Sequence, residues 1–172
     1  MRPVCFHGCV GWLHEPPSNA ASGCAIVIAP PHGFEELCAR RTLRMLADRL
    51  AAAGAPTLRF DWRGTADSLG DPCDPDRLTC WRADLDAAID MMRMRGAREI
   101  GVIGLRFGAL LAAELGTRGV PVDRVAMLAP PPSGRGYVRE MRALSRVTAP
   151  TAASPEPSFD GLVVAGLRTS AQ

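Results

Sequence analysis

The sequence alternates short apolar runs with longer amphipathic segments, and this rhythm limits the folds open to the chain. Residues 24–29 read Cys-Ala-Ile-Val-Ile-Ala and are followed by two prolines, which is typical of a strand covered on both faces. Similar runs predict strands at residues 57–60, 100–103 and 124–128. Strands that alternate with helices are joined by right-handed crossovers and form a parallel sheet. We therefore expect an α/β fold, a three-layer sandwich with a mostly parallel, doubly wound sheet.

Three helices are expected between these strands, at residues 35–53, 78–92 and 107–115. In the first, Leu43, Leu46 and Leu50 recur at spacings of three and four, and Gly54 follows as a stop. The second carries the longest apolar stripe, made of Leu78, Trp81, Leu85, Ile89 and Met92. Each helix thus has one face suited to covering the sheet.

The ends of the chain are less regular. Residues 10–13 predict an antiparallel edge strand, and residues 137–144 predict one more helix. Residues 148–158 are rich in Ala, Pro, Ser and Thr and predict a loop or hinge before a short apolar run at 162–165. We therefore expect a core domain over residues 1–147, and a loop with the start of an incomplete C-terminal portion over 148–172.

Composition excludes several function classes. The chain has 172 residues and a net charge of +2, and its 20 basic residues, all Arg, are scattered. Without a basic cluster, no nucleic-acid partner is expected. No apolar stretch is long enough to span a bilayer, and the start lacks a secretion signal, so we expect a cytoplasmic protein with reduced cysteines.

Cys5, His7 and Cys9 lie close together and are of the residue types that bind zinc. There is, however, no Cys-x-x-Cys motif and no second ligand pair at the spacing of a zinc finger. We expect neither a metal nor a cofactor. A dinucleotide site is also disfavoured, because Gly101, Gly104 and Gly108 do not fit Gly-x-Gly-x-x-Gly.

Chemistry in a parallel sheet collects in the loops at the carboxyl ends of the strands. Three such loops are distinctive here: Pro-Pro-His-Gly-Phe at 30–34, Asp-Trp-Arg-Gly-Thr-Ala-Asp-Ser at 61–68, and Gly-Leu-Arg-Phe-Gly at 104–108. In this order and on these strands, they resemble the oxyanion loop, the Asp-x-Arg-Gly-x-Gly-x-Ser loop and the Gly-x-Ser-x-Gly nucleophile elbow of the α/β-hydrolase superfamily. In the middle loop, Ala66 replaces a usual glycine. The chain is similar, more narrowly, to bacterial exosortase-A-system-associated or serine-aminopeptidase-like hydrolases, over residues 4–145.

The resemblance implies roles for particular residues. His32, Gly33 and Phe34, with Arg106 and Phe107, would form the oxyanion or anion-binding site. A second set would support the loops: Asp61, Arg63, Gly64, Asp67, Ser68, Gly104 and Gly108. The implied activity is hydrolysis of an ester, thioester or amide, with a small-molecule substrate.

The elbow departs from the family pattern at its centre, where Arg106 stands in place of Ser. A guanidinium has no lone pair to attack a carbonyl. The three histidines, His7, His14 and His32, all precede the elbow, whereas the family order places the histidine after it. We therefore expect a truncated hydrolase that is atypical or inactive as it stands. The alternative is a non-catalytic protein that binds an anionic small molecule or a protein partner.

Arg106 and His32 each allow two interpretations. Arg106 lies at a helix N-terminus, where a guanidinium suits a carboxylate or phosphate, but it could equally pair with Asp61 or Glu35. His32 could serve as a base, although a structural role in its loop is favoured. An unfinished sheet would also leave an edge through which a homodimer could form.

Overall fold

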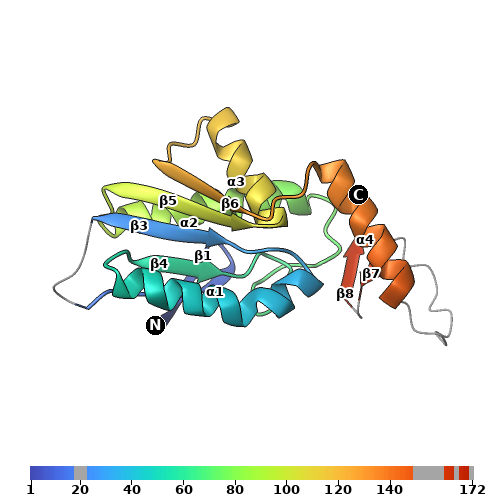
Figure 1. Cartoon of the computed structure of the whole chain (residues 1–172), viewed down its shortest axis with the longest axis horizontal. Helices are drawn as coiled ribbons and strands as arrows, with labels where there is room; N and C mark the ends of the chain where they lie inside the picture. The colour runs from blue at the N-terminus through green and yellow to red at the C-terminus, as the bar shows by residue number, and fades with distance from the viewer. Residues whose placement is uncertain (18–22, 149–160, 165–166, 171–172) are drawn as a thin grey trace.

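The computed structural model describes residues 1–17, 23–148, 161–164 and 167–170 of the chain. A six-stranded mixed sheet has the order β1-β2-β4-β3-β5-β6, and β7 and β8 form a separate antiparallel pair (Figure 1). The strands are β1 (Arg2–Phe6), β2 (Cys9–His14), β3 (Cys24–Ala29), β4 (Thr57–Phe60), β5 (Glu99–Leu105), β6 (Arg124–Leu128), β7 (Gly161–Val164) and β8 (Leu167–Ser170). The helices are α1 (Phe34–Ala52), α2 (Arg77–Met94), α3 (Phe107–Thr117) and α4 (Gly134–Thr148).

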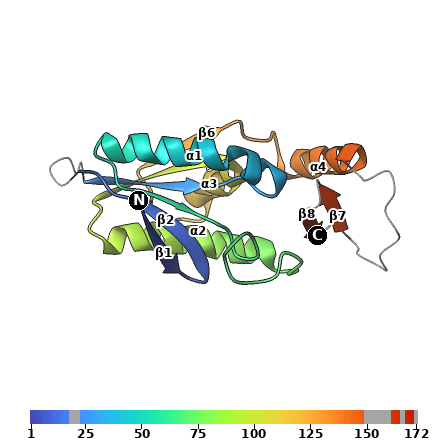
Figure 2. The ribbon, with the colours of Figure 1, turned by 90° about the horizontal axis from the view of Figure 1, so that it is seen from below.

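Helices cover the large sheet on both faces, as Figure 2 shows with α1 above the sheet and α2 below it. The larger core cluster joins α2 and α3 to the sheet through side chains such as Leu85, Ile89 and Leu111, all nearly inaccessible to solvent. On the opposite face, Leu43 and Ala47 of α1 pack on Ile28. The alternating pattern of the sequence therefore produces the expected three layers.

The predicted elements lie within a few residues of the observed ones, with differences at both ends of the chain: β8 was not predicted, and the pairing at the N-terminus differs. The segment predicted as an edge strand is β2, and it is not at the edge, because it pairs antiparallel with β1 on one side and β4 on the other. β1 was not predicted. Its five residues include Arg2, Pro3 and Cys5, which are exposed, so it lacks the apolar run that marks a buried strand.

β6 forms the other edge of the six-stranded sheet. All its residues are exposed, although Val125, Met127 and Leu128 are apolar. The loop expected at 148–158 lies almost entirely outside the described residues, and the apolar run beyond it is found in β7. Among the described residues, no helix is long and apolar enough to cross a membrane.

Candidate functional site

The turn from β5 into α3 holds Arg106 in a strained conformation. Arg106 has φ 53° and ψ −115°, a combination outside the regions that side-chain-bearing residues normally adopt. Such a residue costs about 1–3 kcal/mol and persists only where its surroundings enforce it. Here its N–H donates to the carbonyl of Leu128 at 3.0 Å, which ties the turn to the end of β6.

Two glycines make this turn compact enough to touch its neighbours. A Cβ at Gly108 would lie 2.2 Å from the carbonyl oxygen of Ala29 and 2.5 Å from that of Pro30. A Cβ at Gly104 would lie 2.5 Å from the Cα of Ala109. Both glycines are therefore required by close backbone approach, and they press the start of α3 against the end of β3.

The side chain of Arg106 forms ion pairs with two different helices. Its Nε donates to Glu35 Oε1 of α1 at 2.6 Å, and its Nη2 donates to Glu140 Oε1 of α4 at 2.5 Å. Arg106 and Glu35 are largely buried, whereas Glu140 is 52% exposed. The hydrogen bonds to Glu140 and Glu35 raise the pKa of Arg106 above its already high value, so its positive charge is permanent.

Tyr137 of α4 extends this contact. Its buried hydroxyl lies near enough to Glu35 for that carboxylate to act on it, and among the described residues neither this hydroxyl nor Glu35 Oε2 makes a hydrogen bond. Burial, with the nearby Glu35 carboxylate, raises the pKa of Tyr137, so the phenol stays protonated. The start of α1, the elbow and α4 thus meet at one polar cluster, which we call the Arg106 cluster: Glu35, Arg106, Tyr137 and Glu140.

The loop after β3 lies against the elbow. Gly33 precedes α1 with φ 64° and ψ −133°, a conformation that suits glycine, and Phe34 begins the helix. Phe107 begins α3 in the same way. The first N–H groups of a helix have no acceptor within the helix, so both helix starts carry donors of the kind that an oxyanion hole uses.

The ring of His32 lies beside two other aromatic rings, one of them Phe107 at the start of α3. Its ring centroid is 4.7 Å from that of Trp81 and 6.1 Å from that of Phe107. Burial, and secondarily the charge of Arg77, lowers the pKa of His32 to about 4. The imidazole is therefore neutral at physiological pH. Phe107 in turn contacts Tyr137, with centroids 5.6 Å apart, so apolar packing supports the Arg106 cluster from below.

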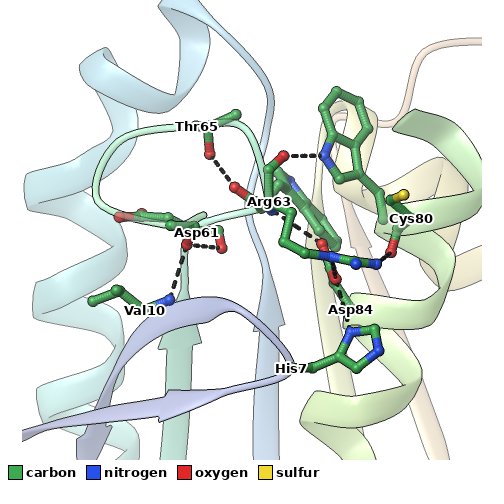
Figure 3. Close-up of polar contacts among 10 residues, drawn as sticks. His7, Val10, Asp61, Arg63, Thr65, Cys80 and Asp84 are labelled. Carbon is green, nitrogen blue, oxygen red and sulfur yellow. Dashed lines mark hydrogen bonds and ion pairs between the residues drawn. The ribbon is translucent and has the colours of Figure 1, made fainter. Parts of the chain in front are cut away.

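The loop after β4 is held by hydrogen bonds to its own backbone and to β2. Ser68 Oγ donates to the carbonyl of Asp61 at 2.7 Å and accepts from the N–H of Val10 at 2.9 Å. Thr65 Oγ1 donates to the carbonyl of Trp62 (Figure 3). Gly64 has φ 75°, and a Cβ there would lie 2.7 Å from the carbonyl oxygen of Asp71. Asp67 is exposed near the tip of the loop.

Arg63 fixes the same loop to α2 through a buried aspartate. Its Nε donates to Asp84 Oδ1 at 2.5 Å, its backbone N–H donates to Asp84 Oδ2 at 3.0 Å, and its Nη2 donates to the carbonyl of Cys80 (Figure 3). His7 also contacts Asp84, at 3.2 Å, and Trp81 Nε1 donates to the carbonyl of Arg63. The loop is therefore attached to α2 and, through His7 and Val10, to the β1–β2 hairpin.

Asp61 is buried beside an arginine that is engaged elsewhere. The nearest guanidinium nitrogen, of Arg40, lies 3.8 Å from Asp61 Oδ1, and Arg40 makes two shorter bonds of 2.9 Å to Glu36. Burial raises the pKa of Asp61 to about 6, against the opposing charge of Arg40. Of the two acids considered as partners of Arg106, the structure pairs it with Glu35, and Asp61 belongs with Arg40.

A protein-family model matches residues 23–161, which include all three loops, and its description is serine aminopeptidase, S33. The chain belongs to the serine aminopeptidase S33 family. The α/β-hydrolase fold expected from the three loops is thereby supported by a match over most of the chain. No match is found among curated proteins.

Solved structures similar to this S33-family chain confirm the fold. An α/β serine hydrolase without a lid from Xanthomonas campestris is 20% identical, with a TM-score of 0.65 over 78% of this chain and 62% of that one. An α/β serine hydrolase homologue from Coxiella burnetii is 22% identical, with a TM-score of 0.61 over 78% and 63%. An esterase from Pyrococcus furiosus is 23% identical, with a TM-score of 0.63 over 86% and 55%. The chain therefore spans less than two thirds of the length of each, and the six-stranded sheet corresponds to the N-terminal part of the fold.

Three residues that complete the site of this S33-family chain were not predicted from the sequence. Glu140 and Tyr137 come from α4, and Asp84 comes from the middle of α2, so none is near a motif in the sequence. Asp84 carried a usable signal, because it is a charged residue within an apolar helical stripe. In the described part of the chain, no three His, Cys, Asp or Glu side chains gather as a metal site would require.

Proposed function

We propose that this S33-family chain is a non-hydrolysing member in which the nucleophile position has become a structural ion pair. The observation that supports this is the Arg106 side chain, whose Nε and Nη2 are bound to Glu35 and Glu140 at 2.6 and 2.5 Å. A permanently protonated guanidinium cannot add to an ester, thioester or amide carbonyl. Residue 106 then joins three segments instead of forming an acyl-enzyme.

The donors of an oxyanion hole are compatible with this proposal. The first N–H groups of α1 and α3 belong to the fold, and they stabilise a carbonyl oxygen only when a nucleophile attacks beside them. The neutral His32 lies among aromatic rings and serves in this account as packing for the elbow, not as a base.

An anionic ligand at Arg106 was the other candidate for this position. Two carboxylates already more than balance its charge, and they take the Nε and one terminal nitrogen of the guanidinium. The proposal therefore assigns Arg106 a structural role. The exosortase-system subgroup, the cytoplasmic location and a homodimer through an unpaired sheet edge stay as predictions from the sequence.

The proposal is tested with a fluorophosphonate probe and a p-nitrophenyl acetate assay on the purified chain. Intact-mass spectrometry is expected to show no phosphonate adduct, with hydrolysis no faster than for a chain denatured beforehand. The Arg106→Gln variant is the matched control and should give the same rate. A stoichiometric adduct on a serine of the folded chain, or turnover that falls in Arg106→Gln, would show that the chain hydrolyses after all.

A further inference from the structure

A hollow that includes none of the elbow residues lies beside α1, where the helix meets β2 and β4. Its volume is about 730 Å³, and it opens between α1 and the face of β2 and β4. This volume is within the range of small-molecule pockets, roughly 300–1,000 Å³. The proposed function makes no use of it.

The lining of this hollow is strongly basic. Four arginines, Arg40, Arg41, Arg44 and Arg59, line it with a single acid, Asp48. Four arginines against one acid leave an excess of positive charge in the lining. Arg40 is neutralised by Glu36, and Arg44 lies 3.8 Å from Asp48. Within the described residues, Arg41 makes no ion pair.

Arg59 is held in place by a buried histidine. Its Nε donates to His14 Nε2 at 3.2 Å, and since that nitrogen accepts, the proton of the neutral ring lies on Nδ1, which donates to Asp48 at 2.7 Å. The side chain of His14 is only 2% exposed, and burial lowers its pKa, in keeping with a neutral ring. This chain of bonds connects α1, β2 and β4 and orients the guanidinium.

The oriented guanidinium lies over an aromatic face. Trp12 and Arg59 are direct cross-strand partners of β2 and β4, and the Arg59 Cζ is 5.0 Å from the Trp12 ring centroid. Leu37 and Met45 of α1 also line the hollow and are about half exposed. The lining therefore combines guanidinium groups with apolar and aromatic side chains.

From this arrangement we infer that the hollow binds a small organic phosphate. The phosphate is held by Arg41, Arg44 and Arg59, because guanidinium forks match phosphate oxygens. The apolar or aromatic part of the ligand lies against Trp12, Leu37 and Met45. The same chemistry is offered by a soluble phosphate ester and by the headgroup of an anionic lipid. Binding here is independent of the role of Arg106.

The test is a calorimetric titration of the whole chain with phenyl phosphate and with inorganic phosphate. Phenyl phosphate is expected to bind at least tenfold more tightly, because only it fills both halves of the hollow. The double variant Arg41→Gln, Arg44→Gln should weaken its binding at least tenfold. Arg49→Gln, an exposed arginine of the same helix outside the hollow, should change binding less than twofold. Trp12→Leu should remove the preference for phenyl phosphate over phosphate.

Co-sedimentation with vesicles distinguishes the two sources of the ligand. Binding to phosphatidylglycerol vesicles but not to phosphatidylcholine vesicles, lost in the double variant, would identify a lipid headgroup. Phenyl phosphate binding without vesicle binding would identify a soluble ester. The inference is overturned if phenyl phosphate binds no better than phosphate, or if Arg49→Gln weakens binding as much as the double variant does.

Discussion

At the scale of single residues, the site depends on charges held in places that water reaches poorly. Arg106 and Arg63 are each satisfied by carboxylates, Glu35 and Asp84, that are largely buried with them. Asp61 is the exception, because its arginine neighbour lies 3.8 Å away and is engaged by Glu36. A buried carboxylate without a close partner favours its protonated form.

This exception predicts a pH dependence of stability. The pKa of Asp61 is about 6 in the folded chain and near 3.8 in the unfolded one, so the folded form holds the proton more tightly. Its stabilising effect is complete below pH 3.8 and is lost as the pH rises through 6. Asp61→Asn should therefore gain roughly 2 kcal/mol relative to wild type between about pH 4 and about pH 7.5 in urea unfolding. The control is Arg49→Gln, at an exposed position of α1, which should show a flat difference because a guanidinium stays charged over this pH range. An equally flat difference for Asp61→Asn would contradict the account.

At the scale of elements, the elbow joins a strand and a helix that pack closely because two of its residues are glycines without a side chain. Gly104 and Gly108 allow α3 to begin directly against β3 and β5, and this contact fixes the direction of the Arg106 side chain. A helix glycine with open space around its Cα is not required by close packing. Gly116, also in α3, is of this kind, because a Cβ added there would meet no neighbouring element within 4 Å.

The two α3 glycines predict opposite effects of the same substitution. Gly108→Ala should destabilise the chain by about 3 kcal/mol or more, because its Cβ meets backbone carbonyls that cannot move cheaply. Gly116→Ala should stabilise it by about 0.5–1 kcal/mol, because alanine restricts the unfolded chain and favours the helix. Thermal and urea unfolding measure both. Equal effects of the two substitutions would show that the elbow is not closely packed.

Most of the elements could be predicted from the sequence, because each of these carries a local signal. The apolar runs of β3 and β6 and the stripe of α2 depend on periodicity, and the elbow depends on two glycines at a fixed spacing. β1 could not be predicted, since its stability comes from pairing with β2 and not from its own residues. The two partners of Arg106 differ in the same respect. Glu35 could be predicted because it is next to a recognised loop, whereas Glu140 could not, because only the position of α4 in the fold brings it to Arg106.

At the scale of the whole molecule, Arg106 is the point at which segments distant in sequence meet. Glu35, Arg106 and Glu140 are separated by 71 and 34 residues along the chain, and they belong to α1, the elbow and α4. In Figure 1, α4 lies at the end of the sheet to which β3 and β5 point. The ion pairs therefore connect α4 to the carboxyl edge of the sheet, where a hydrolase of this fold would bind its substrate.

A double-mutant cycle between residues 106 and 35 tests the structural role of Arg106 most directly. Unfolding free energies are measured for wild type, Arg106→Gln, Glu35→Gln and the double variant. Any change in backbone strain at residue 106 is the same with and without Glu35, so it cancels in the cycle. The account predicts a coupling energy of about 1–3 kcal/mol, since both side chains are largely buried. The parallel cycle with Glu140→Gln should give a smaller value, because Glu140 is half exposed. A coupling between residues 106 and 35 that is indistinguishable from zero would contradict the account.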